Sequence, residues 1–157
     1  MIDFVVYGNA QPAGSKRAFQ HRHTGRIVVT DDNPKSRSWK NDVADTAAAA
    51  MNGRQLLAGP LSLCVVFSIP RPKSHYGTGR NFGVVRNTAP RWPTVKPDAT
   101  KLVRAVEDAL TGIVWRDDAQ VVHQIVSKRY GEPACAQIFV DQMADENAPQ
   151  LPIEEVA

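Results

Sequence analysis

The apolar residues of this chain gather in short runs separated by polar, turn-rich segments. Runs with the β-branched and aromatic content that favours strands cover residues 2–7, 26–30, 61–69, 119–130 and 134–143. Gly131 and Pro133 lie between the last two runs and are typical turn residues. The pattern therefore predicts five strands, the last two joined by a turn.

Two other segments have the features of helices. In the first, Asn33 is a good N-cap, Pro34 fits the first helical position, and Gly53 can end the helix in a left-handed conformation. The second is predicted over residues 98–111 and stops before Gly112. At about 100° per residue, one face of this second helix carries Leu102, Ala105, Val106, Ala109 and Leu110.

The resulting order, β-β-α-β-loop-α-β-β, predicts an α+β fold in which two main helices pack against a small mixed sheet. At 157 residues, with 43% hydrophobic and 22% charged residues, the chain suits one globular domain. We expect this domain to span residues 1–143. Residues 144–157 are acidic and contain proline, which predicts a disordered tail.

Several classes of protein are disfavoured by composition. No apolar run approaches the roughly 20 residues that a membrane-spanning helix needs. The first residues lack the basic start and long apolar core of a signal peptide, so a cytoplasmic protein with no membrane partner is expected. Cys64 and Cys135 lie among apolar, strand-like neighbours, which favours buried free thiols over a disulfide or a metal pair.

Charge is unevenly distributed along the chain. From Asp141 to the end there are five acidic residues and no Lys or Arg, which leaves 19 basic and 11 acidic residues in the body. A basic excess confined to a compact body favours a polyanionic partner such as DNA. The same excess also serves solubility, so the location of the basic residues matters more than their number.

Two segments concentrate the basic residues. Residues 70–97 form a long connection rich in Pro and Gly, with six basic residues, no acidic residue and interleaved aromatic residues, of which Trp92 is the candidate for base stacking. A solvated insertion is the alternative. In the N-terminal segment, His21 and His23 favour DNA contact or plain surface over a metal site. The residues expected to bind DNA are Lys16, Arg17, Arg22, Lys73, Arg80, Arg86, Arg91 and Lys96.

Acidic residues flank the second predicted helix. Asp98 stands at its start, and Asp117 and Asp118 follow its end. Clustered carboxylates suit Mg²⁺ and phosphodiester hydrolysis, and Lys101 and Arg104 are available to stabilise negative charge on a phosphate. Each residue also has a plainer interpretation: an N-cap for Asp98, a turn for the acid pair, and the solvated helix face for the two cations.

These acids can share an ion only if they converge in space. That requires the strand that begins near Asp118 to start beside the N-terminus of the helix. Residues 112–116 would span about 17 Å if fully extended, against about 21 Å for a 14-residue helix. Convergence is therefore possible, but the spacing alone does not establish it.

The stretch KPDATKLVRAVEDALTGIVWRDDAQVV, residues 96–122, resembles the signature of the RusA family of Holliday junction resolvases. That signature reads roughly Lys/Arg-Pro-Asp-x-Asp-Asn-Leu-x-Lys, then Asp-Ala-Leu, then a Trp shortly before Asp-Asp-x-Gln-Val. The order of strands and helices agrees more loosely over most of residues 1–143. The resemblance implies an endodeoxyribonuclease that uses Mg²⁺, for which Mn²⁺ can substitute.

Aligned on this signature, Asp98 and Asp118 take metal-binding positions and Asp117 lies beside them. Arg104 stands where the family has a Lys needed for cleavage, with Lys101 as the second choice. Thr100 replaces the second Asp of the signature, which removes one carboxylate and puts the affinity for metal in question.

The resemblance also implies a homodimer, which suits a two-fold symmetric four-way junction. The family acts on branched DNA in recombination and repair, and many small members come from phages or prophages. Two rival hypotheses remain open. Thr100 suggests a junction-binding protein with weak or no cleavage, and the basic surface alone permits a module that binds an acidic protein without salt-sensitive affinity for DNA.

Overall fold

The structure, a computed structural model, describes residues 1–14, 16–31 and 34–143. The main elements are β1 (Ile2–Tyr7), β2 (Lys16–Gln20), β3 (Ile27–Asp31), α1 (Pro34–Met51), β4 (Leu61–Ile69), α2 (Ala99–Leu110), β5 (Val121–Tyr130) and β6 (Cys135–Gln142). Short 3₁₀ helices are η1 (Lys73–His75), η2 (Gly79–Asn81) and η3 (Asp118–Gln120). The predicted cap at Asn33 and the predicted tail at 144–157 lie outside the described residues.

Four strands form one mixed sheet in the order β1-β6-β4-β5. β6 is antiparallel to both β1 and β4, whereas β4 and β5 are parallel, with Leu61 opposite Val121 and Ile69 opposite Tyr130. β5 is therefore an edge strand that starts at the same end of the sheet as β4. This sheet, with its two helices, confirms the predicted α+β fold.

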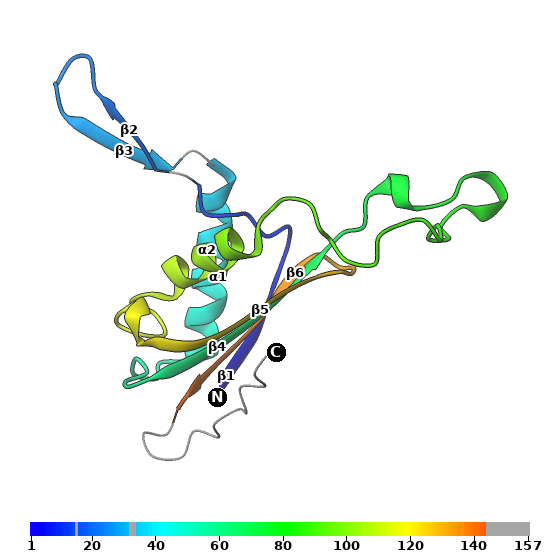
Figure 1. Ribbon diagram of the computed structural model, residues 1–157. Coiled ribbons are helices and arrows are strands. Elements are labelled where there is room, and N and C mark those ends of the chain that lie inside the picture. Colours follow the sequence, from blue (N-terminus) through cyan, green and yellow to red (C-terminus); the bar gives the residue numbers. More distant parts are fainter. Residues whose placement is uncertain (15, 32–33, 144–157) are drawn as a thin grey trace, which may run out of the picture.

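The run at residues 26–30 forms a strand, β3, which lies outside the main sheet. β3 pairs only with β2, a strand that the sequence pattern did not predict, in a separate two-stranded ribbon. The sequence of β2, KRAFQ, has little apolar content, so its strand conformation depends on pairing with β3. Figure 1 shows this ribbon projecting from the body.

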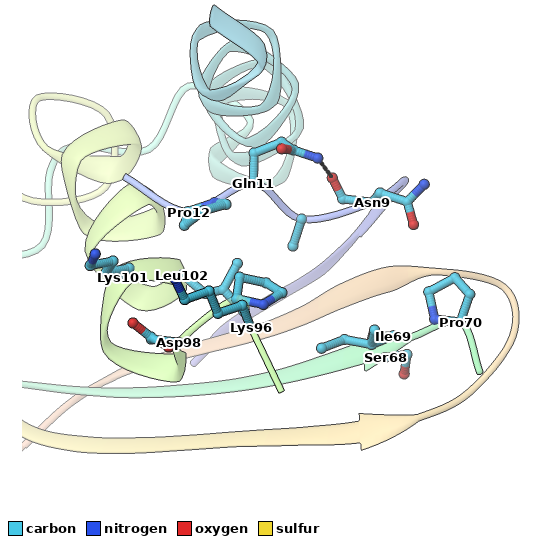
Figure 2. A pocket seen from close by; sticks show the side chains of 12 residues that line it. Asn9, Gln11, Pro12, Ser68, Ile69, Pro70, Lys96, Asp98, Lys101 and Leu102 are labelled. Atoms are coloured by element: carbon cyan, nitrogen blue, oxygen red, sulfur yellow. Dashed lines mark hydrogen bonds between the residues drawn. The ribbon is translucent and has the colours of Figure 1, made fainter. Parts of the chain in front are cut away.

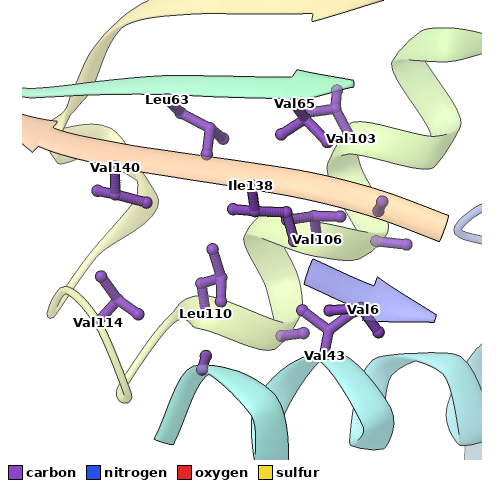
Figure 3. Packing of buried hydrophobic residues seen from close by; sticks show 14 of the residues in the cluster. Val6, Val43, Leu63, Val65, Val103, Val106, Leu110, Val114, Ile138 and Val140 are labelled. Carbon is purple, nitrogen blue, oxygen red and sulfur yellow. The ribbon is translucent and has the colours of Figure 1, made fainter. Parts of the chain in front are cut away.

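The core lies between the sheet and the two helices, which cover the same face of the sheet (Figure 1). In Figure 3, Val103, Val106 and Leu110 of α2 point into a layer that also contains Val43 of α1 and Ile138 of β6. The predicted apolar face of α2 is confirmed: its buried residues are Leu102, Val103, Ala105, Val106, Ala109 and Leu110.

The structure also bears on smaller predictions, of which those for Gly53 and for free cysteine thiols are confirmed. Gly53, just after α1, has a φ of +76°, a backbone conformation that favours glycine. Both cysteines are free thiols; Cys135 is buried and Cys64 is half-buried. In the described part of the chain, no helix is both long enough and apolar enough to cross a membrane.

Candidate active site and nucleic-acid surface

Asp98 occupies the N-cap position of α2, but its side chain makes no capping hydrogen bond. The carboxylate is exposed and lines a cleft of about 450 Å³. Figure 2 shows it at the start of α2, in the same cleft as Lys96, Lys101 and Ser68, a residue near the end of β4. The plain interpretation of Asp98 as a helix cap is therefore not supported, and its charge faces solvent next to two cations.

The start of α2 is held by hydrogen bonds from β5 and from the segment between β1 and β2. Lys128 on β5 donates from Nζ to the carbonyl oxygens of Val95 (3.0 Å) and Pro97 (2.8 Å). The Ala13 backbone N–H donates to the carbonyl of Lys101 at 2.8 Å. Because Lys128 lies near the end of β5, these bonds fix Asp98 at the end of the sheet where β4 and β5 finish.

Asp117 and Asp118 differ in their roles although they are neighbours. Asp117 caps η3: its Oδ1 accepts from the Ala119 backbone N–H at 2.9 Å, while the Gln120 side chain accepts from the Asp117 backbone N–H at 3.1 Å. Gln120 also donates to the carbonyl of Leu57, which ties the turn to the segment before β4. Asp118 is exposed, and its carboxylate makes no hydrogen bond or salt bridge to another described residue.

The two ends of the candidate site do not meet within one copy of the chain. Residues 112–116, which would need to extend, instead form a compact turn in which the Gly112 N–H donates to the Trp115 carbonyl at 2.7 Å. Asp118 therefore stays near the start of β4 and β5, whereas Asp98 lies where β4 ends. β4 has nine residues, which at about 3.3 Å per residue separates its ends by roughly 26 Å.

Glu107 is an acidic residue of this region whose position the sequence did not reveal. It lies on α2 and accepts a 2.6 Å hydrogen bond from Nε2 of Gln124 on β5. Burial raises the pKa of its carboxyl above the ordinary value, the Gln124 hydrogen bond opposes the rise, and the negative charge of Asp118 adds to it. The electrostatic effect of Asp118 indicates that the two carboxylates are close. In the sequence, Glu107 lies in the last turn of the helix and Asp118 follows the end of the helix.

The candidate cations lie on the exposed side of α2. Lys101 and Arg104 are both exposed, and Arg104 is close enough to Glu107 to lower the pKa of that carboxyl. At about 100° per residue, Thr100, Arg104 and Glu107 share one stripe of the helix. Because Glu107 contacts β5, this stripe faces the edge of the sheet. Arg104 therefore lies on α2 between the end that carries Asp98 and the end that approaches Asp118.

The two basic segments predicted to bind DNA both stand away from the core (Figure 1). Lys16 and Arg17 lie on β2, and Arg22 is exposed in the turn between β2 and β3. The connection between β4 and α2 is ordered rather than structureless, since it contains η1 and η2. All five basic residues predicted to bind DNA in this connection are exposed, namely Lys73, Arg80, Arg86, Arg91 and Lys96.

A basic α+β domain that exposes carboxylates next to cationic segments has the features of an enzyme acting on nucleic acid. A family model described as "Endodeoxyribonuclease RusA" matches residues 9–141. A Bacillus subtilis (strain 168) protein named "Uncharacterized protein YqaN" is 31% identical over 143 residues, which cover 91% of this chain and 97% of that protein. The chain belongs to the RusA family of endodeoxyribonucleases, and it is a DNA-hydrolysing enzyme of the junction-resolvase type.

Proposed function

We propose that the protein is a Mg²⁺-dependent, structure-selective endonuclease that works as a homodimer on four-way junctions and other branched DNA. Membership of the RusA family supports the class of reaction. The observation that carries the finer proposal is the placement of two exposed carboxylates, Asp98 and Asp118, at the two ends of the α2–β5 unit. Such an enzyme serves recombination, repair or the processing of phage DNA in the cytoplasm of a bacterial or phage-infected cell.

Within one copy, Asp98 and Asp118 are too far apart to share one Mg²⁺, because they lie at opposite ends of β4. Among the described residues, no group of three or more His, Cys, Asp or Glu side chains is arranged to hold a metal ion. Mg²⁺ is bound in enzymes through one or two carboxylates together with waters and substrate phosphates. We propose that a second copy brings a carboxylate close to Asp98 or to Asp118.

The sheet offers a way to do this. β5 is an edge strand, and its side chains Val122 (63% exposed) and Ile125 (48% exposed) are uncovered. An edge strand presents unpaired backbone groups, and two-fold symmetry places two copies of such a strand antiparallel. The start of one β5 then lies opposite the end of the other. Because Lys128 holds the segment before Asp98 at the end of β5, this pairing brings Asp118 of one copy towards Asp98 of the other.

In this arrangement, Asp98 and Asp118 of a second copy hold Mg²⁺ at each of two equivalent sites. When bound, the ion polarises the scissile phosphate and lowers the pKa of a coordinated water. Arg104 neutralises charge on the phosphate, with Lys101 as the second choice, although an arginine fork differs in shape from the family's lysine. Glu107, next to Asp118, supplies a carboxylate in place of the one lost at Thr100. Asp117 stabilises the turn that presents Asp118.

The test is incubation of the pure protein with a labelled synthetic four-way junction and a linear duplex of the same sequence, in Mg²⁺, in Mn²⁺ and in EDTA. The proposal predicts nicking of the junction in either metal, little cutting of the duplex, and none in EDTA. Asp118→Asn is expected to lower junction cleavage by at least about 100-fold. Wild-type protein that binds the junction but leaves it uncut in both metals excludes the nuclease.

Thr100 favours a second candidate, a junction-binding protein with weak or no cleavage, because an exposed hydroxyl stands where the family signature has a carboxylate. Thr100→Asp separates the two. A gain of more than about tenfold in cleavage, with junction affinity unchanged in EDTA, indicates that the natural site is impaired. A change of less than about threefold indicates that the natural site is already complete.

A further inference from the structure

The connection between β4 and α2 forms an arm, here called the basic arm, over residues 71–96. Its two sides are joined by backbone hydrogen bonds, from Gly77 N–H to the Val84 carbonyl at 2.8 Å and from Arg86 N–H to the His75 carbonyl at 2.9 Å. The Arg86 side chain also donates from Nε to the Tyr76 carbonyl at 2.8 Å. The arm is thus stabilised by its own hydrogen bonds, and it projects from the body (Figure 1).

The base of the arm is fastened to the end of β5, the same end that holds Asp98. Arg71 donates from Nη1 to the Pro90 carbonyl at 2.8 Å, which closes the base. Its guanidinium lies 4.1 Å from the centre of the Tyr130 ring, and the His75 ring meets Tyr130 edge-on. These contacts give the arm a defined direction relative to Asp98.

The far end of the arm presents a bare aromatic ring. Phe82 follows η2 and is 86% exposed. The turn before it is tight, because a Cβ added at Gly77 would lie 2.5 Å from the Asn81 carbonyl oxygen. Gly83, directly after Phe82, has a φ of +80°, which favours glycine. The backbone conformation on both sides of Phe82 is therefore defined, and the ring itself is exposed.

An exposed phenylalanine is unfavourable in water, and this one lies in a segment whose charged residues are all basic. Arg80 and Arg86 flank it, and residues 71–96 contain no acidic residue. The positive charge favours a polyanion over an apolar protein surface as the partner. The exposed ring disfavours a polyanion that has no flat rings, such as a cluster of acidic side chains. Nucleic acid combines phosphates with aromatic bases, and base–aromatic stacking is indifferent to sequence.

We propose that Phe82 stacks on a base exposed at the branch point of DNA, and that the basic arm thereby distinguishes branched DNA from linear duplex. In a continuous duplex both faces of each internal base are covered by neighbouring pairs. At a branch point the base stack is interrupted. An aromatic ring that reaches the branch point can therefore stack on the exposed face of a base. This inference rests on the proposed action on branched DNA and adds the residue that recognises the branch.

The experiment measures binding of the full-length protein to a four-way junction and to a linear duplex, in EDTA so that cleavage does not interfere. Phe82→Ala is expected to weaken junction binding roughly tenfold and to leave duplex binding unchanged. Val84→Ala, which truncates another exposed apolar residue of the arm (60% exposed), serves as the matched control and should leave both affinities unchanged. Equal melting temperatures of all variants show that the fold is intact.

Phe82→Trp provides a direct readout of stacking. Because the indole ring can also stack on bases, the Phe82→Trp variant should retain junction affinity. The junction should quench the fluorescence of the variant more than that of the wild type, whereas the duplex should quench both proteins equally. Junction binding that is unaffected by Phe82→Ala, or equal loss on junction and duplex, overturns the inference. Wild-type protein with no preference for the junction instead contradicts the proposed function itself.

Discussion

Nε2 of Gln124 on β5 donates a 2.6 Å hydrogen bond to Oε1 of Glu107 on α2. The bond joins the edge strand of the sheet to the helix stripe that carries Arg104. Burial raises the pKa of the Glu107 carboxyl, and the nearby negative charge of Asp118 adds to the rise. Glu107 is therefore an acid whose ionised form is disfavoured by the fold.

This pKa shift predicts a pH-dependent difference in stability between the wild type and Glu107→Gln. A carboxyl whose pKa is raised by folding stabilises the protein at low pH and loses that contribution as pH rises through the folded-state value. Glutamine keeps an acceptor for Gln124 and does not ionise. The stability of the variant relative to the wild type should therefore rise as pH increases above about 4.5, as measured by urea denaturation. A constant difference, or a gain for the wild type, would be inconsistent with the shift.

Truncation of Asp117 should affect mainly stability, whereas truncation of Asp118 should affect mainly cleavage. Asp117→Ala removes a cap of η3 and is expected to lower the free energy of unfolding by about 1 kcal/mol. Asp118→Ala removes no hydrogen bond within the described chain and relieves the repulsion of Glu107, so its stability should not fall while junction cleavage is lost. Chemical denaturation and single-turnover cleavage measure the two effects. Equal loss of stability in both variants contradicts the assignment.

Lys128 positions the segment that precedes Asp98. Lys128→Met keeps the aliphatic stem but removes the hydrogen bonds to the carbonyl oxygens of Val95 and Pro97. We expect the free energy of unfolding to fall by about 1 to 2 kcal/mol, and the cleavage rate of bound junction to fall more than junction affinity. Arg129→Met, one residue further along β5, is the comparison for cleavage, because it removes hydrogen bonds to Ser68 and Gln137 but none to the segment before Asp98. Equal behaviour of the two variants would show that Lys128 has no special role.

The basic arm should contribute to affinity through its charge as well as through Phe82. Replacing Lys73 and Arg80 together by Ala is expected to lower the dependence of log K on log salt concentration by about 2 for duplex and junction alike. Arg54→Ala, an exposed residue outside both basic segments, is the control. Binding measured across a salt series gives the slopes, and an unchanged slope in the double variant removes the arm from the DNA interface.

The sequence predicted those parts of the fold whose signals are local. The strand at 61–69 and the buried face of α2 agree with the structure because strand propensity and helical periodicity are properties of neighbouring residues. β2 was missed because its conformation depends on pairing with β3 rather than on its own composition. The separate position of the β2–β3 ribbon is likewise a tertiary property.

The site residues show the same limit. Asp98 and Asp118 were identified because they flank the second predicted helix and match positions of the family signature, and the spacing left open whether they converge within one copy. The spacing of residues 112–116 allows either an extended link or a compact turn, and the hydrogen bond between Gly112 and Trp115 closes the turn. Glu107 was overlooked because only the contact between α2 and β5 brings it close to Asp118.

The most direct test of the shared site mixes two inactive variants. Asp98→Asn and Asp118→Asn are each expected to lose junction cleavage, and after equal mixing with subunit exchange about a quarter of all sites should contain both intact acids, one from each copy. The account predicts that nicking returns to a comparable fraction of the wild-type rate. If both acids acted within one copy, every site in the mixture would lack one of them, and continued absence of nicking after verified exchange would contradict the account.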